Sequence, residues 1–199
     1  MTWMRQEGVG DVVAKPGWRG RISASARAGS AAAGEGEDAG LSTMAPWLAR
    51  LTGLGLELPP AARPVATYVP AAAYGGLIWV SGQLPMVRGE VAVRGRLGGG
   101  LELAAGQEAA RLCVLNALAA ACAVVPGGAA GLEGVLRVEG FVQCTADFHD
   151  QPKVLNGASD LLAVLFPGGG HVRTAVGCAA LPLDAAVEVA VVFRATQRS

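Results

Sequence analysis

The chain has 199 residues, long enough for about one domain and a terminal extension. Apolar residues make up 52% and charged residues only 16%, a composition that can bury a sizeable core and excludes disorder along the whole chain. Sixteen Lys and Arg balance sixteen Asp and Glu. The net charge of zero argues against nucleic acid as a partner, because neutralising many phosphates takes a surplus of cations.

Residues 1–43 differ from the rest of the chain. They lack apolar periodicity, and from residue 12 to 34 they contain Arg, Lys and Ser but no acidic residue. Such a stretch is typical of an organelle transit peptide. The alternatives are a disordered tail, or upstream codons translated ahead of a start at Met44. We expect 1–43 to be a dispensable extension and 44–199 to be the folded domain, soluble in the chloroplast or mitochondrial matrix in the first case and otherwise in the cytoplasm.

An uncharged stretch at residues 112–132 is long enough to cross a bilayer. Pro126-Gly127-Gly128 ends the predicted helix at Val125, and the stretch is rich in Ala rather than Leu or Ile. We therefore expect a buried helix of a soluble protein, with no membrane partner.

The four cysteines and two histidines predict no metal site. No two cysteines form a CxxC pair, and their spacings match no zinc-binding pattern. A chain of this size and composition needs no disulfides, so we expect reduced thiols in the core, with neither metal nor organic cofactor.

Hydrophobic patterning predicts an α+β fold. The expected elements are a short helix starting near Pro46, strands near 67–72, 77–80 and 91–97, a helix over 107–125, a strand over 136–146, a helix from the N-cap Asp150 to Phe166, and strands over 172–179 and 187–193. We expect the second strand to end at a Ser81-Gly82-Gln83 turn.

The last two strands carry the residues with the clearest chemistry. One face of the strand 172–179 holds Arg173 among Ala175 and Gly177, so the guanidinium has space around it to bind a carboxylate with two hydrogen bonds. The small residues on that face also favour close packing of subunits. Glu188 is a lone acid in an apolar strand, a candidate for a raised pKa and proton transfer. The alternative is that Arg173 and Glu188 pair with each other on a solvated face.

Three segments together resemble the Rid (reactive intermediate deaminase) family, also called YjgF-like or endoribonuclease L-PSP-like. Residues 68–85, with Ser81-Gly82-Gln83, resemble the opening hairpin of that family. Residues 173–189, with Arg173, Leu181-Pro182 and Glu188, resemble its closing signature. Residues 148–159 are similar to a longer-looped bacterial-type subgroup. The resemblance covers about residues 48–194.

The resemblance implies a chorismate-mutase-like fold with two helices on one face of a mixed sheet, assembled as a homotrimer around a central barrel. Small 2-imino and 2-oxo acids would bind in clefts between subunits, and reactive imines or enamines such as 2-aminoacrylate would be hydrolysed to 2-oxo acids and ammonia. Arg173 would hold the substrate carboxylate and Glu188 would activate water. The cleft would be lined by Tyr68, Ser81, Asn156 and the backbone of Ala175.

Two positions depart from the family pattern. Ala175 stands where the family often has Cys, and Gly177 stands where it often has Glu. A non-catalytic trimer that senses 2-oxo acids is therefore the alternative to a deaminase, and a ribonuclease is a third reading that the zero net charge disfavours.

Overall fold

A computed structural model describes residues 44–61 and 67–196. The expectations for residues 1–43 lie outside the described residues. In chain order the elements are α1 (Pro46–Gly53), β1 (Ala71–Tyr74), β2 (Leu77–Gln83), β3 (Met86–Val87), β4 (Glu90–Val91), α2 (Leu103–Val124), η1 (Gly128–Gly131), β5 (Leu132–Gln143), α3 (Gln151–Leu165), β6 (Val172–Cys178), η2 (Pro182–Asp184) and β7 (Val187–Ala195).

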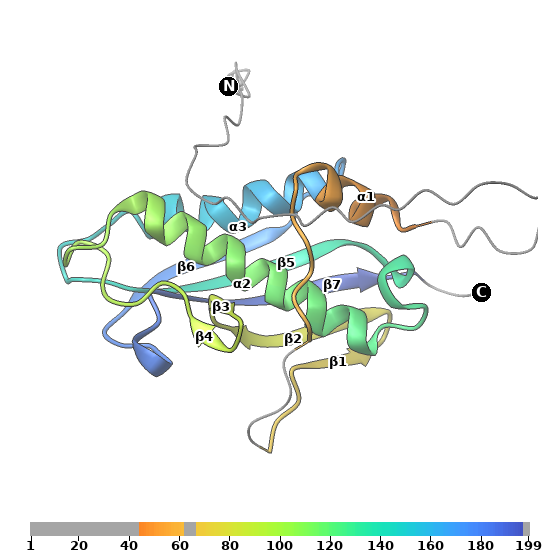
Figure 1. The fold of residues 1–199 in the computed structure, drawn as a ribbon, viewed down its shortest axis with the longest axis horizontal. Coiled ribbons are helices and arrows are strands. Elements are labelled where there is room, and N and C mark those ends of the chain that lie inside the picture. Colours follow the sequence, from red (N-terminus) through yellow and green to blue (C-terminus); the bar gives the residue numbers. More distant parts are fainter. Residues whose placement is uncertain (1–43, 62–66, 197–199) are drawn as a thin grey trace, which may run out of the picture. The chain divides into compact units, whose positions relative to one another are not determined.

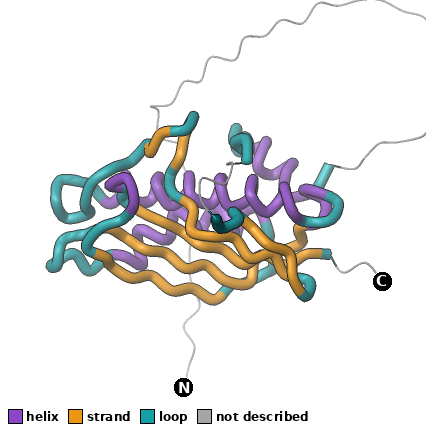
Figure 2. The backbone as a smooth tube through the Cα atoms, turned by 90° about the horizontal axis from the view of Figure 1, so that it is seen from below, coloured by secondary structure: helices purple, strands orange, loops and turns teal. Residues whose placement is uncertain are grey.

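Five strands form one mixed sheet in the order β1-β2-β7-β5-β6. Neighbours are antiparallel except β5 and β6, which run parallel because α3 forms the crossover between them. Helices α2 and α3 lie side by side on one face of the sheet, here called the covered face (Figure 1). No described helix lies on the other, the open face (Figure 2). The predicted α+β class, with two helices packed on one face, is confirmed.

The core lies between the sheet and the two long helices. In β7 the side chains alternate as predicted: Val187, Val189, Val191 and Phe193 are fully buried on the covered face. Close approach of α2 and α3 depends on Gly157, where a Cβ atom would lie 2.0 Å from the backbone oxygen of Gln107.

Helix α2 is long and apolar enough to span a membrane, and it is alone in this among the described helices. It packs against the sheet and against α3, and 12 of its residues are buried there. Its apolar character therefore matches the predicted role as a core helix.

Several predicted boundaries are wrong. Ser81-Gly82-Gln83 is no turn, because β2 continues to Gln83 through a bulge that shifts its register with β7 after Val80. The strand expected over 91–97 is reduced to β4, and beyond it Arg94 makes only an isolated bridge to Ala185. Glycines at positive φ, Gly95 and Gly98, interrupt this segment.

Three other elements begin about four residues from their predicted first residues. Strand β1 begins at Ala71 rather than near Thr67, α2 begins at Leu103, and β5 begins at Leu132. Helix α3 follows Asp150 as predicted, although the Asp150 side chain forms an ion pair with Lys153 (3.0 Å) instead of a side-chain cap.

Candidate functional site

Arg173 lies near the start of β6, on the covered face beside α3. Its Nη1 atom donates hydrogen bonds to Asn156 Oδ1 and Ser159 Oγ, each at 3.0 Å. Asn156 and Ser159 are three residues apart, so both project from the same side of α3. An Arg side chain has five N–H donors, and two are used here. The guanidinium is thus held in place while three donors stay available for an anion.

Ser159 also connects to a histidine. Its Oγ atom lies 3.0 Å from Nε2 of His171, the residue just before β6. Burial, and secondarily the positive charge of Arg173, lower the pKa of His171 from its ordinary value of 6.5. His171, Ser159 and Arg173 therefore form one hydrogen-bonded chain.

The backbone of Ala175 faces the free edge of the sheet. β6 is the edge strand beyond β5, and the carbonyl of Cys178 accepts a hydrogen bond from Cys144 N at the end of β5. Because backbone groups alternate in direction along a strand, those of Ala175 point away from β5. The Ala175 side chain packs on the core beneath α3. Arg173 and Asn156 are thus in contact, and the Ala175 backbone lies two residues further along the same edge strand.

Glu188 lies in the middle strand, β7, on the open face, opposite Phe141 of β5. Its carboxylate lies directly over Gly82, where an added Cβ would meet Glu188 Oε1 at 1.8 Å. A side chain at position 82 would therefore displace the Glu188 carboxylate from the place it has here. Among the described residues Glu188 has neither an ion pair nor a hydrogen bond through its side chain. Burial raises the pKa of its carboxyl group above the ordinary value of 4.5.

Ser81 lies next to Gly82 and is bonded to the segment that carries Tyr68. Ser81, adjacent to Gly82, donates its hydroxyl to the carbonyl of Val69 (2.8 Å) and its backbone N–H to Pro70 (2.9 Å). These bonds fasten the segment that carries Tyr68 to β2. Tyr68 is 56% exposed, so its ring is open to a ligand or to another chain.

The predicted site residues thus fall into two groups on opposite faces of the sheet. Arg173 shares its face with Gly140 and the helices, whereas Glu188 shares the other with Phe141. The alternative in which Arg173 and Glu188 pair with each other is wrong for this chain. The expectation that the face with Ala175 and Gly177 packs against another subunit stays a prediction: Ala175 is partly buried against the core of its own chain, whereas Gly177 is exposed.

The contacts around Gly177 explain why a side chain larger than glycine does not fit there, although the family often has Glu at this position. A Cβ atom there would lie 2.8 Å from Cys144 Sγ and 2.9 Å from Gln151 Nε2. The space that a larger side chain would take is therefore already filled by neighbours from β5 and α3.

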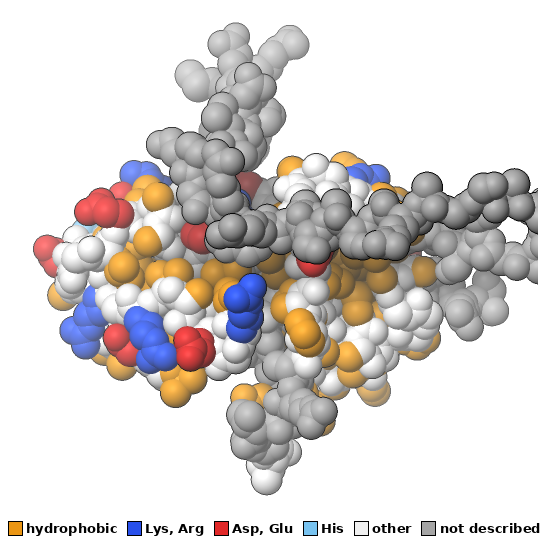
Figure 3. Space-filling model, viewed as in Figure 1, with side chains coloured by type: hydrophobic (Ala, Val, Ile, Leu, Met, Phe, Trp, Pro, Cys, Tyr) orange, Lys and Arg blue, Asp and Glu red, His pale blue; other side chains and the backbone are white. Residues whose placement is uncertain are grey.

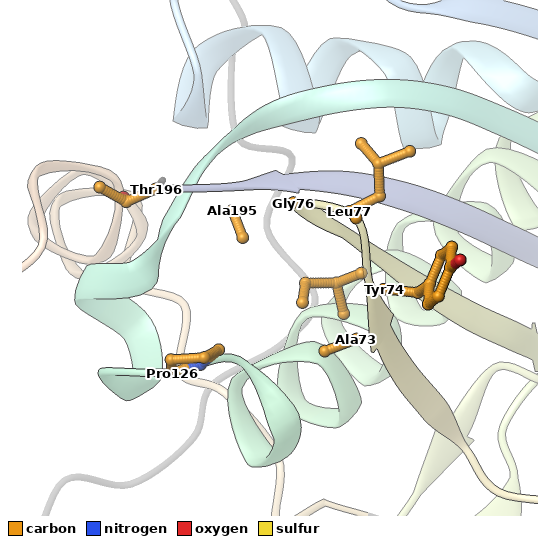
Figure 4. Close-up of a pocket in the computed structure, with 9 residues that line it drawn as sticks. Ala73, Tyr74, Gly76, Leu77, Pro126, Ala195 and Thr196 are labelled. Atoms are coloured by element: carbon orange, nitrogen blue, oxygen red, sulfur yellow. The ribbon is translucent and has the colours of Figure 1, made fainter. Parts of the chain in front are cut away.

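Two surface hollows lie elsewhere. One of about 500 Å³ lies between the β1–β2 hairpin, Pro126 and the end of β7, and has no charged residue in its lining (Figure 4). The other, of about 610 Å³, lies at the carboxyl ends of β5 and β6, with Arg96, His149, Cys144 and Cys178 in its wall. Neither of these two hollows includes Arg173 or Glu188 in its lining.

The four thiols are unpaired; Cys113 is buried in the core, Cys122 and Cys144 are partly buried and pack against it, and Cys178 is partly buried. Among the described residues there is no cluster of three His, Cys, Asp or Glu side chains able to hold a metal ion. On the covered face, charges of both signs are interspersed and gather toward the β3–β4 hairpin (Figure 3).

Sequence reasoning missed Ser159, His171 and Gly82 as parts of the site. The signals were present: Asn156 and Ser159 have helical spacing, and His171 and Arg173 are two apart, which places them on one side of an extended segment. Gly82 carried no such signal, because its position over the Glu188 carboxylate depends on the pairing of β2 with β7.

The mixed sheet with two helices on one face makes this chain a small α+β domain. Its two charged candidate residues, Arg173 and Glu188, lie on opposite faces of the sheet. A family described as "YjgF/chorismate_mutase-like, putative endoribonuclease" matches residues 48–194. The chain belongs to this family, and the resemblance seen in the sequence is confirmed at that level.

Individual relatives agree with this membership. The chain is 41% identical over 143 residues to Protein TCP17 of Trypanosoma cruzi, spanning 71% of this chain and 89% of that protein. It is similar to the crystal structure of Atu1372 from Agrobacterium tumefaciens, a protein of unknown function, with 40% identity, a TM-score of 0.70 and coverage of 75% and 92% of the two chains. A "putative endoribonuclease" from Shewanella oneidensis is 33% identical, with a TM-score of 0.68 and coverage of 73% and 97%.

Proposed function

We propose that this protein hydrolyses reactive 2-imino and enamine acids, of the 2-aminoacrylate type, to 2-oxo acids and ammonia. The site would combine the Arg173 group of one copy with the Glu188 group of another. One observation carries the proposal: Arg173, which is anchored and has free donors, and Glu188, an unpaired and half-buried carboxylate, lie on opposite faces of one sheet.

The open face supports contact with further copies. Large apolar side chains are exposed there, from 37% for Phe141 to 64% for Val172, with Trp79 and Val176 between these values. Adjacent apolar side chains of this kind mark a surface that gains free energy when another protein covers it. The family resemblance implies three copies, so we propose a homotrimer whose sites lie between subunits.

In the proposed reaction the substrate carboxylate takes the free donors of Arg173 as a bidentate pair. The backbone of Ala175 faces the reacting nitrogen, and Glu188 accepts a proton from water as the water oxygen bonds to C2 of the imine. Glu188 returns that proton to the nitrogen, which gives a carbinolamine. The nitrogen then takes a second proton while the C2 hydroxyl loses one, and the C2–N bond breaks to release ammonia and the 2-oxo acid. A raised pKa suits Glu188 for this exchange, because the carboxyl can both take and return a proton.

The test is to generate 2-aminoacrylate in situ and to follow pyruvate and ammonia with and without the protein. Release several-fold faster than the uncatalysed reaction, with loss of the acceleration in Glu188→Gln, would support the proposal. Saturable pyruvate binding without acceleration would replace it with the 2-oxo-acid sensor. RNA cleavage that persists in both Arg173→Ala and Glu188→Gln would place a nuclease outside this site.

A further inference from the structure

His171 and Ser159, which are hydrogen-bonded in series to Arg173, have no part in the function proposed above. Arg173 Nη1 donates to Ser159 Oγ at 3.0 Å, and Ser159 Oγ lies 3.0 Å from His171 Nε2. The imidazole is partly buried just before β6. A titratable group is thus joined by one hydroxyl to the guanidinium that would bind the substrate.

An arginine only donates, so Ser159 Oγ accepts from Arg173. The bond between Ser159 and His171 can run in either direction: an imidazole that carries its proton on Nδ1 accepts the serine hydrogen at Nε2, whereas a protonated Nε2 donates to Ser159 Oγ. Protonating an imidazole of the first kind reverses the bond and places a second positive charge within two hydrogen bonds of Arg173.

We propose that His171 is a proton-linked positioning residue: acting through Ser159 it orients Arg173, and it takes up a proton when a small carboxylate binds that arginine. The inference rests on the proposed function only in assigning a carboxylate ligand to Arg173.

The electrostatics give the sign of the linkage. In the free protein burial, and then the Arg173 charge, hold the pKa of His171 below its ordinary value. A bound carboxylate offsets the Arg173 charge and therefore raises the pKa of His171. Binding and protonation then favour each other, so affinity for a 2-oxo acid should rise as pH falls through the titration of His171.

Other charged groups around His171 act less directly. On α3, Asp160 follows Ser159 and is exposed. From β7, the Arg194 guanidinium reaches the turn before His171, with Nη2 3.6 Å from the Cβ position of Gly169. On β5, Arg137 and Glu139 form an ion pair with each other on the open face. Arg173 is the charged group among the described residues that shifts His171.

The first experiment needs no ligand. The full chain has two histidines, so both imidazoles can be followed by NMR between about pH 5 and 8. Arg173→Gln should raise the pKa of His171 and leave that of His149 unchanged, because His149 lies at the other end of α3. An unmoved His171 would overturn the inference.

The second experiment titrates the protein with pyruvate. Wild type should bind more tightly at about pH 5.5 than at about pH 7.5 and take up protons, as read from calorimetry in buffers of different ionisation enthalpy. His171→Gln should abolish the proton uptake, while His149→Gln should keep it. Ser159→Ala should weaken binding about threefold to tenfold, the effect of one lost hydrogen bond, and reduce the uptake.

Glu188→Gln separates the two titratable groups of the site. Uptake that survives Glu188→Gln but disappears in His171→Gln supports the inference, and the reverse overturns it. If pyruvate does not bind, Arg173 is not a carboxylate site: the proposed function and this ligand linkage both fail, even where the first titration shows that His171 and Arg173 are coupled. If pyruvate binds with His171-dependent uptake but imines are not hydrolysed, the deaminase proposal alone fails.

Discussion

The two faces of the sheet differ in the bonding of their charged residues. On the covered face, Arg173 is held by two side chains of α3 from its own chain. On the open face, Glu188 is half-buried, lacks a described partner and lies among exposed apolar side chains. Arg173 is thus oriented for a ligand by its own chain, whereas Glu188 lies on a surface that a further chain would cover.

The two faces are separated by the sheet itself, so one chain cannot bring its own Arg173 and Glu188 into a single site. Chemistry at Glu188 and binding at Arg173 should therefore depend on assembly in addition to their own side chains.

The largest expected effect is on assembly. Val176→Asp puts a charge on the open face, and we expect monomers by light scattering and no detectable imine hydrolysis. Val164→Asp is the matched control, because Val164 on α3 is equally exposed (44% against 42%) but lies away from the open face. If Val176→Asp keeps the oligomer and the activity of wild type, the open face is not the contact surface.

Glu188→Gln should preserve pyruvate binding and reduce turnover by about 10²–10⁴, the usual size of a general acid–base contribution. Glu139→Gln, which changes a second carboxylate on the open face, serves as the control in steady-state kinetics. Full turnover in Glu188→Gln would remove Glu188 from the mechanism.

Arg173→Ala should weaken pyruvate binding by on the order of 2–5 kcal/mol if the pair is well desolvated. Arg173→Lys should also weaken it, although less, because a point-charge ammonium cannot reproduce the planar fork. Calorimetry measures both, with the exposed Arg111→Lys as control. Unchanged binding in Arg173→Ala would contradict the proposed site.

Gly82→Ala tests how the bulge positions Glu188. The new methyl group would occupy the place of the carboxylate, so we expect turnover to fall about 10–100-fold through misplacement, with binding at Arg173 retained. Gly53→Ala adds a methyl group into open space and should change nothing. Wild-type kinetics in Gly82→Ala would show that the carboxylate position is not critical.

The smallest expected effect is on stability. Because the pKa of Glu188 is raised in the folded state, ionising it costs stability: its favourable contribution is present below the ordinary pKa of 4.5 and is lost as pH rises through the raised value. Glu188→Gln should therefore melt above wild type at about pH 7 and equal it at about pH 4. Thermal melts check this, with the exposed Glu133→Gln as control. A lower melting temperature at neutral pH would mean that the carboxylate is stabilised by a partner.

Local patterns predicted most of the elements but not their ends. Helix α3 was found from Asp150 and Pro152, and β7 from its alternation, because capping and side-chain periodicity are local properties. The strand expected over 91–97 and the turn at Ser81 were wrong. Pairing with β7 extends β2 through its bulge, and glycines at positive φ break the other segment, which are effects of long-range partners and of backbone conformation.

The sequence by itself determined the family, the α+β class and the residue types at Arg173, Asn156 and Glu188, because these depend on local order and on short motifs. Only the tertiary structure decided which side chains meet. The crossover through α3 places Asn156 and Ser159 against Arg173, and the register of β7 with β5 turns Glu188 to the opposite face. Neighbouring residues in a strand face opposite sides of the sheet. Which residues of two paired strands share a face therefore depends on the register between strands that are far apart in the sequence.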